Sequence, residues 1–116
     1  MVNEPVPRTS NDILEQLAAV IEQRKHADPA QSYVASLFAK GRHKIAQKVG
    51  EEGVEVALAA VGTDSNAIVS ELADLWFHSL VLLADADIPH QAVFNELGRR
   101  FGLPGLEEKA ARHQDH

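Results

Sequence analysis

Two apolar segments of helical period constrain the fold of this chain more than any other feature. Residues 42–61 carry an apolar seam at alternating steps of four and three, and residues 66–86 are apolar on nearly every side. The stretch GTDSN that separates them is a turn rich in helix-capping side chains. Two helices joined by so short a turn pack side by side and antiparallel. The sequence therefore predicts a helical hairpin at the centre of the fold.

Three further helices are predicted beside this hairpin. The first covers about residues 10–26, a short second helix ends at Gly41, and the last begins after Pro89 and ends near Gly102. Pro29 is suited to the first position of the short helix. No alternating pattern of strand length is present, so we expect an all-α bundle of about five helices. Since residues 66–86 are apolar nearly all round, we also expect dimerisation to complete the bundle.

Length and composition limit the domain organisation and the partners. With 116 residues the chain has room for one core, which we place in residues 10–106, between a flexible N-terminal arm (1–9) and a C-terminal tail (107–116). The absence of cysteine excludes disulfides and thiolate metal sites, and the net charge of −6 argues against nucleic-acid binding. There is no signal-peptide core at the N-terminus, and the run LWFHSLVLLA is too short to span a bilayer. We expect a soluble cytoplasmic protein without a membrane partner.

Two pairs of carboxylates interrupt the apolar hairpin segments. Glu52 and Glu55 lie in the first segment and Glu71 and Asp74 in the second, each pair at a spacing of three that puts both acids on one helix face. Glu52 even occupies a seam position where a hydrophobe is expected. One such pair alone is usually a solvated face, but two pairs inside apolar runs on adjacent helices indicate a bound cation. All-oxygen ligands of this kind suit magnesium. The complete seam is Ile45, Val49, Glu52, Val56 and Ala59.

Other polar residues near these acids allow two interpretations each. Lys44 and Lys48 belong to a basic segment directly before the first acid pair, which suits a polyphosphate ligand, although a single lysine is more often solvated. His78 lies four residues after Asp74 and could share a metal with it, but a lone histidine on an apolar helix is more often a hydrogen-bonded core residue. Tyr33 either lines a ligand pocket or packs in the core. Gly53, inside a helix, suggests the close approach of a neighbour.

The acids also carry a resemblance to a known family. The run EEGVE, followed after fifteen residues by ELAD, resembles the EExxE…ExxD signature of the all-α nucleotide pyrophosphatase superfamily. Within that superfamily, SYVASLFAKGRHKIAQKVGEE and ELADLWFHSLVLLA are similar to the phosphoribosyl-ATP pyrophosphatases of histidine biosynthesis, over about residues 12–105. Two positions depart from the pattern: Gly53 stands where alanine is usual, and His43 where an acid is frequent. Neither departure affects the acid pairs.

The resemblance implies magnesium-dependent hydrolysis of phosphoribosyl-ATP to phosphoribosyl-AMP and pyrophosphate. Magnesium would be held by the two acid pairs, and one of Glu51, Glu52 or Glu55 would act as the base toward water. The residues expected to contact substrate phosphates are Lys44, Lys48, Arg99 and Arg100, the two arginines from the last helix or from a partner subunit.

Three other functions remain open on the sequence. A house-cleaning nucleoside triphosphate pyrophosphohydrolase would use the same acids and metal and would differ only in its base and ribose pocket. A non-catalytic helical dimerisation module would carry the acids as surface charges paired with lysines. A metal-storage or metal-sensing bundle is disfavoured by the lack of histidine ligands at matching spacing.

Overall fold

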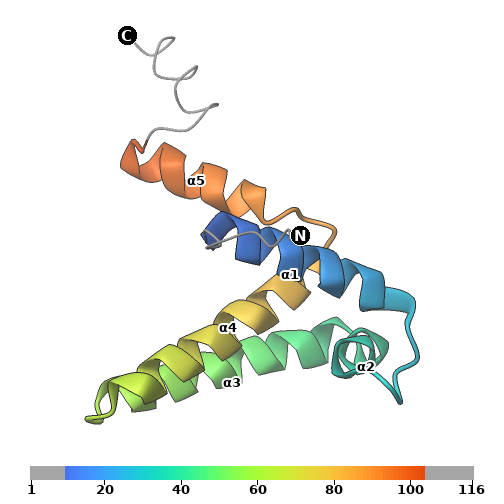
Figure 1. Cartoon of the computed structure of the whole chain (residues 1–116), viewed down its shortest axis with the longest axis horizontal. Coiled ribbons are helices and arrows are strands. Elements are labelled where there is room, and N and C mark those ends of the chain that lie inside the picture. The colour runs from blue at the N-terminus through green and yellow to red at the C-terminus, as the bar shows by residue number, and fades with distance from the viewer. Residues whose placement is uncertain (1–9, 104–116) are drawn as a thin grey trace, which may run out of the picture. The chain divides into compact units, whose positions relative to one another are not determined.

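The computed structural model of the chain describes residues 10–103, and the side chains of residues 13–103. It contains α1 (Ser10–Gln23), a 3-10 turn η1 (Arg24–His26), α2 (Tyr33–Lys40), α3 (Arg42–Ala60), α4 (Ser65–Asp85) and α5 (Gln91–Phe101), and no strand among the described residues. The expected all-α class is thus confirmed (Figure 1). The predicted arm and tail, residues 1–9 and 107–116, lie outside the described residues.

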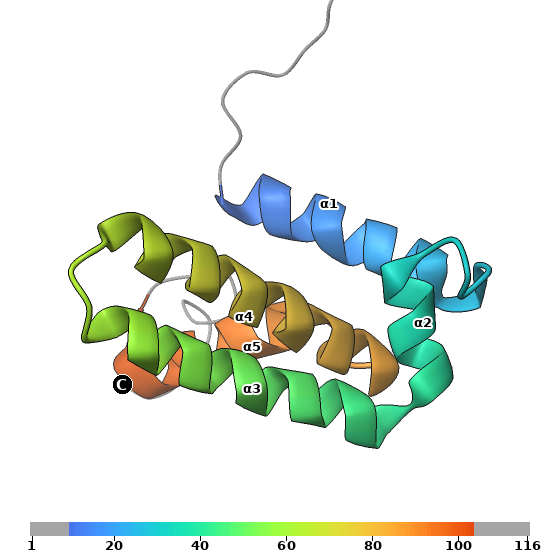
Figure 2. The same ribbon diagram turned by 90° about the horizontal axis from the view of Figure 1, so that it is seen from below.

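The described chain divides into two compact units, one ending at Ala86 and the other beginning at Asp87. In the first unit α3 and α4 form the predicted hairpin and lie side by side in both ribbon views (Figures 1 and 2). The helices end where the punctuation of the sequence predicts. Gly41, at a φ of 97°, separates α2 from α3, and the side chain of Asp64 accepts a hydrogen bond from the backbone N–H of Asn66 at the start of α4.

The start of α2 differs from the prediction. Pro29 lies in a turn closed by the Gln31 N–H, which donates to the Asp28 carbonyl, and the Asp28 carboxylate accepts from the N–H of Ala30. The helix begins four residues later, capped by Ser32, whose hydroxyl accepts the N–H of Ala35. Pro29 is therefore not the first residue of α2, because the Asp28 side chain stabilises a turn in its place.

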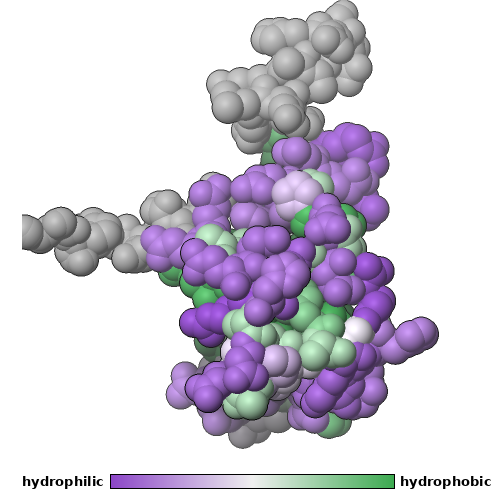
Figure 3. All heavy atoms as spheres, turned by 90° about the vertical axis from the view of Figure 1, so that its right-hand side faces the viewer, coloured by the Kyte–Doolittle hydropathy of each residue, from purple (hydrophilic) through white to green (hydrophobic). Residues whose placement is uncertain are grey.

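The core of the first unit lies at one end of the hairpin, where α1 and α2 cover it. Its fully buried large side chains come from α1, α2, the beginning of α3 and the second half of α4: Ile21, Leu37, Ile45 and Val81. Toward the turn at residues 61–64 the hairpin continues beyond this core. Apolar side chains are exposed in this part of the hairpin: Val54 and Leu58 of α3, Val61 after the end of α3, and Val69 of α4. Trp76, near the middle of α4, is also exposed. Figure 3 shows one face of the molecule, where hydrophilic side chains predominate and apolar ones appear between them.

α4 is long and apolar enough to cross a membrane, with 21 residues and a mean hydropathy of 1.5 over its most apolar 18 residues. Its place in the fold gives another reason for this composition. One side of α4 packs on α3 and part of its length packs on α1. Its buried apolar side chains are Leu80 and Val81, and most of the others are partly buried. It also carries Glu71 and Asp74 at mid-length, and acids are costly in lipid.

The second unit contains α5, which is amphipathic. The left-handed Gly102, at a φ of 65°, ends the helix. The only acid of α5, Glu96, pairs with Arg99 and Arg100 at spacings of three and four, and these two guanidinium groups lower the pKa of Glu96 to about 2.

Candidate metal and phosphate site

The seam of α3 brings an acid against α4. All five seam residues are at least partly buried, whereas most of the remaining α3 positions are exposed, so the predicted seam is the face turned toward α4. Glu52 therefore points at its neighbour helix with only 13% of its side chain exposed. A hydrophobe at this position would pack against α4. The carboxylate instead reaches the acids of α4.

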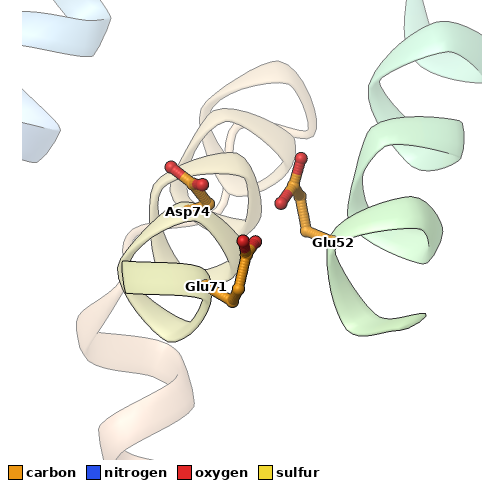
Figure 4. Close-up of side chains that lie close together, drawn as sticks. All are labelled: Glu52, Glu71 and Asp74. Carbon is orange, nitrogen blue, oxygen red and sulfur yellow. The ribbon is translucent and has the colours of Figure 1, made fainter. Parts of the chain in front are cut away.

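Three acids meet between the two helices. One carboxylate oxygen each of Glu52, Glu71 and Asp74 lies within 4.8 Å of the others. Figure 4 shows the three side chains converging, Glu52 from α3 and the other two from α4. Carboxylates at such separations repel one another unless a proton or a cation lies among them. The arrangement therefore suits a hard divalent cation with oxygen ligands.

The charge of this cluster affects the pKa of Glu71. Its pKa is raised above the ordinary value, first because the carboxyl is partly removed from water and then because of the negative charges of Glu55, Asp74 and Glu52. Glu55 is not one of the three grouped ligands and is itself exposed. It is nevertheless the strongest of the three charge effects on Glu71. Glu71 and Asp74 thus lie next to Glu52, and Glu55 acts on Glu71 through its negative charge from outside this group.

Glu51 and Lys48 form a second layer on the outer side of α3. The Lys48 ammonium lies 3.5 Å from Glu51 and 3.8 Å from Glu52, and Gln47 donates a 2.7 Å hydrogen bond to Glu51. The bond from Gln47 is the main reason that the pKa of Glu51 is lowered, and Lys48 adds to it. Lys44 lies one turn earlier on α3 and lowers the pKa of Glu51 slightly. Lys48 therefore offers a positive charge at the rim of the acid cluster.

The remaining predicted phosphate contacts, Arg99 and Arg100, lie on α5 in the second unit. Both are exposed, and both donate to Glu96. Their role toward phosphate stays a prediction.

His78 is a buried, hydrogen-bonded residue, as the alternative to metal sharing predicted. It is 5% exposed, and both ring nitrogens have protein partners: Nδ1 is 2.8 Å from the Asp74 carbonyl oxygen and Nε2 is 2.9 Å from the Tyr33 hydroxyl. Tyr33 is 53% exposed, so it is not a core residue. The sequence did not reveal this contact, which joins residues 45 positions apart.

Comparison of the sequence with known proteins identifies the family of the chain. A family model described as phosphoribosyl-ATP pyrophosphohydrolase matches residues 14–101. The chain belongs to the phosphoribosyl-ATP pyrophosphohydrolase family. It is 52% identical over 101 residues to a phosphoribosyl-ATP pyrophosphatase of Methylococcus capsulatus, covering 87% of this chain and 96% of the relative. A protein of the same name from Janthinobacterium sp. (strain Marseille) is 52% identical over 112 residues, covering 90% and 99%. The matched region of the family includes all four predicted metal ligands.

Proposed function

We propose that this member of the family hydrolyses phosphoribosyl-ATP to phosphoribosyl-AMP and pyrophosphate, the second step of histidine biosynthesis. Family membership over nearly the whole chain supports the substrate. The observation that carries the chemistry is the convergence of Glu52, Glu71 and Asp74 within 4.8 Å between α3 and α4. A triphosphate needs a cation to bind against acids, and a cation among these acids would offset their mutual repulsion.

We infer that the cation is magnesium, held by Glu52, Glu71 and Asp74, with Glu55 as a further ligand. Burial is the first cause of the raised pKa of Glu71, and the negative charges of its acidic neighbours are the second; a bound cation would offset those charges. Magnesium, when bound, would neutralise the phosphate oxygens and stabilise charge on the departing pyrophosphate. The carboxylates fix where the phosphates lie. Lys48 and Lys44 complete the site from the side of α3 by offering donors to phosphate oxygens that the acids cannot provide.

The hydrolysis itself requires a base near the acid cluster. A water oxygen forms a bond to phosphorus, the bridging P–O bond breaks, and a carboxylate accepts the proton of the water. The carboxylate of Glu51 is already engaged, because Gln47 donates a hydrogen bond to it and Lys48 pairs with it. We therefore assign the base to Glu52 or Glu55, and Glu51 to holding Lys48 at the rim.

We further propose that the protein works as a homodimer or larger homo-oligomer in the cytoplasm. The apolar side chains exposed on the outer part of the hairpin, among them Leu58, Val61 and Trp76, form the surface that a second copy would cover. This surface belongs to the same hairpin as the acids.

Pyrophosphate release tests the proposal. Phosphoribosyl-ATP and a panel of canonical and noncanonical nucleoside triphosphates are each incubated with the protein, with magnesium and with EDTA. We expect magnesium-dependent turnover of phosphoribosyl-ATP at a kcat/KM well above that of any triphosphate in the panel. A preference for a noncanonical triphosphate would mean a house-cleaning enzyme, and no turnover of any substrate would leave a non-catalytic helical module.

A further inference from the structure

The hydrogen bonds of His78 connect the start of α2 to a predicted metal ligand. A carbonyl oxygen only accepts, so His78 Nδ1 must carry the proton that it shares with the Asp74 carbonyl at 2.8 Å. In the neutral ring Nε2 is then an acceptor, and the Tyr33 hydroxyl donates to it at 2.9 Å. The result is a directed chain from the Tyr33 hydroxyl through the imidazole to the Asp74 main chain.

Ring contacts support the side chains of this hydrogen-bonded chain. The imidazole is 5% exposed and lies edge-on to Phe77 and to Tyr33, with ring centroids 4.9 and 5.9 Å away. The Tyr33 ring stacks on Phe77 at 6.2 Å with 23° between the planes. Tyr33 is also the first residue of α2, directly after the Ser32 cap. Its position is therefore fixed at the backbone, at the ring and at the hydroxyl.

The connection matters because the acids come from different helices. Glu52 belongs to α3, which follows α2 after Gly41, whereas Glu71 and Asp74 belong to α4. The bond from Tyr33 to His78 therefore links the α2–α3 segment to α4 one helical turn from Asp74. Rotation or sliding of α4 against α3 would alter the separation of the three carboxylates, and magnesium tolerates only small departures from its ligand geometry.

We propose that Tyr33 and His78 are positioning residues for the cation site: the Tyr33 hydroxyl acts through the His78 imidazole to hold α4, and with it Asp74, in register with Glu52. This inference rests on the proposed magnesium site, and it deepens that proposal by adding two residues outside the acid signature. Neither residue is a ligand in this arrangement, because the Tyr33 hydroxyl donates to His78 Nε2 and His78 Nδ1 donates to the Asp74 carbonyl.

The test is a double-mutant cycle read out by magnesium binding without substrate. Tyr33→Phe removes one hydroxyl and keeps the stacked ring, and His78→Leu removes the connection. The dissociation constant for magnesium is measured by isothermal titration calorimetry for the wild type, both single variants and the double variant. We expect Tyr33→Phe to weaken magnesium binding about 10-fold, at the lower end of the range for residues that orient metal ligands. In the His78→Leu background the same substitution should have almost no effect.

A matched control separates positioning from general loss of stability. Val34→Ala truncates a buried neighbour of Tyr33 in α2 without touching the hydrogen bonds. It should lower the unfolding midpoint at least as far as Tyr33→Phe and leave the magnesium dissociation constant within twofold of the wild type. Equal weakening by Val34→Ala, additive effects in the cycle, or unchanged binding in Tyr33→Phe would overturn the positioning role. If the wild type itself bound no magnesium while still hydrolysing phosphoribosyl-ATP, the metal assignment would fail and the proposed activity would stand.

Discussion

Replacing Glu52 by leucine should stabilise the metal-free protein while abolishing the cation site. Glu52 fills a seam position with 13% of its side chain exposed, so about seven-eighths of a leucine placed there would be buried. Leucine has about two more apolar carbon groups than the glutamate stem, and each is worth ~0.8 kcal/mol when buried. The gain is therefore about 1.4 kcal/mol. Loss of the partly exposed ion pair with Lys48 subtracts up to ~1 kcal/mol, while relief of repulsion from Glu71 and Asp74 adds to the gain.

We expect a net increase of about 1 kcal/mol in the free energy of unfolding, or a melting temperature higher by roughly 4–8 °C for a domain of this size. Urea unfolding in EDTA, followed by far-ultraviolet circular dichroism at fixed protein concentration, measures it. Helix propensity does not interfere, since leucine and glutamate are nearly equal in that respect. Saturating magnesium should reverse the order, because at 100 times its dissociation constant a ligand stabilises the wild type by ~2.7 kcal/mol and leaves the variant unchanged.

Two controls separate packing from charge. Glu52→Gln removes the charge and keeps the size, so it should give only the part of the gain that comes from repulsion. Glu55→Leu also removes a negative charge near Glu71, but at an exposed position where leucine cannot be buried. It therefore measures the effect of charge removal without the gain from burial. If Glu52→Leu were less stable than the wild type in EDTA, or if magnesium stabilised both equally, Glu52 would not be a charge held in the place of a hydrophobe.

Three smaller perturbations test other parts of the structure. The raised pKa of Glu71 means that its contribution to stability is complete below about pH 4.5 and is lost as the pH rises through the pKa of the folded state. In EDTA near pH 7, Glu71→Gln should therefore have a higher free energy of unfolding than the wild type. Urea titrations should show that this difference shrinks as the pH falls toward 4.5. Gly53→Ala should raise the free energy of unfolding by ~0.5–1 kcal/mol, since a Cβ there meets nothing within 4 Å; a destabilised variant would show that a neighbour approaches this glycine in the assembled protein. Arg42→Ala removes a partly exposed ion pair between the ends of α3 and α4 and should cost ~0.2–1 kcal/mol by the same measurement; a loss above 2 kcal/mol would assign Asp85 a larger role than a surface pair.

The helices of this protein were largely predictable because their signals are local. The hairpin segments predicted at 42–61 and 66–86 became Arg42–Ala60 and Ser65–Asp85, since glycine, capping side chains and apolar period act within a few residues. The seam around Glu52 followed from the same period. The prediction that Pro29 begins the short helix was wrong, because the Asp28 side chain stabilises a turn at this position.

The convergence of three of the four predicted acids could be predicted from the sequence, whereas Glu55 lies outside that group and the contacts around the acids could not be predicted. The spacing of the carboxylates placed Glu52, Glu71 and Asp74 on facing sides of adjacent helices, which is enough to bring them together. The contact between Tyr33 and His78 depends on how α2 crosses α4, and no periodicity in the sequence encodes that crossing. The expected close neighbour of Gly53 was wrong for the described chain, because a Cβ at this position would meet nothing within 4 Å.

The central claim is that carboxylates from two helices of one hairpin carry out the hydrolysis of phosphoribosyl-ATP. Its most direct test is the rate of pyrophosphate release from phosphoribosyl-ATP by Glu52→Gln and Asp74→Asn, each compared with the wild type at saturating magnesium, with circular dichroism to verify the helical fold. Both variants keep the size of the side chain and remove one negative charge. We predict a loss of at least 100-fold in kcat/KM, of the order seen when an electrostatic catalytic group is removed, in proteins that remain helical. Retention of wild-type activity in either variant would contradict the account.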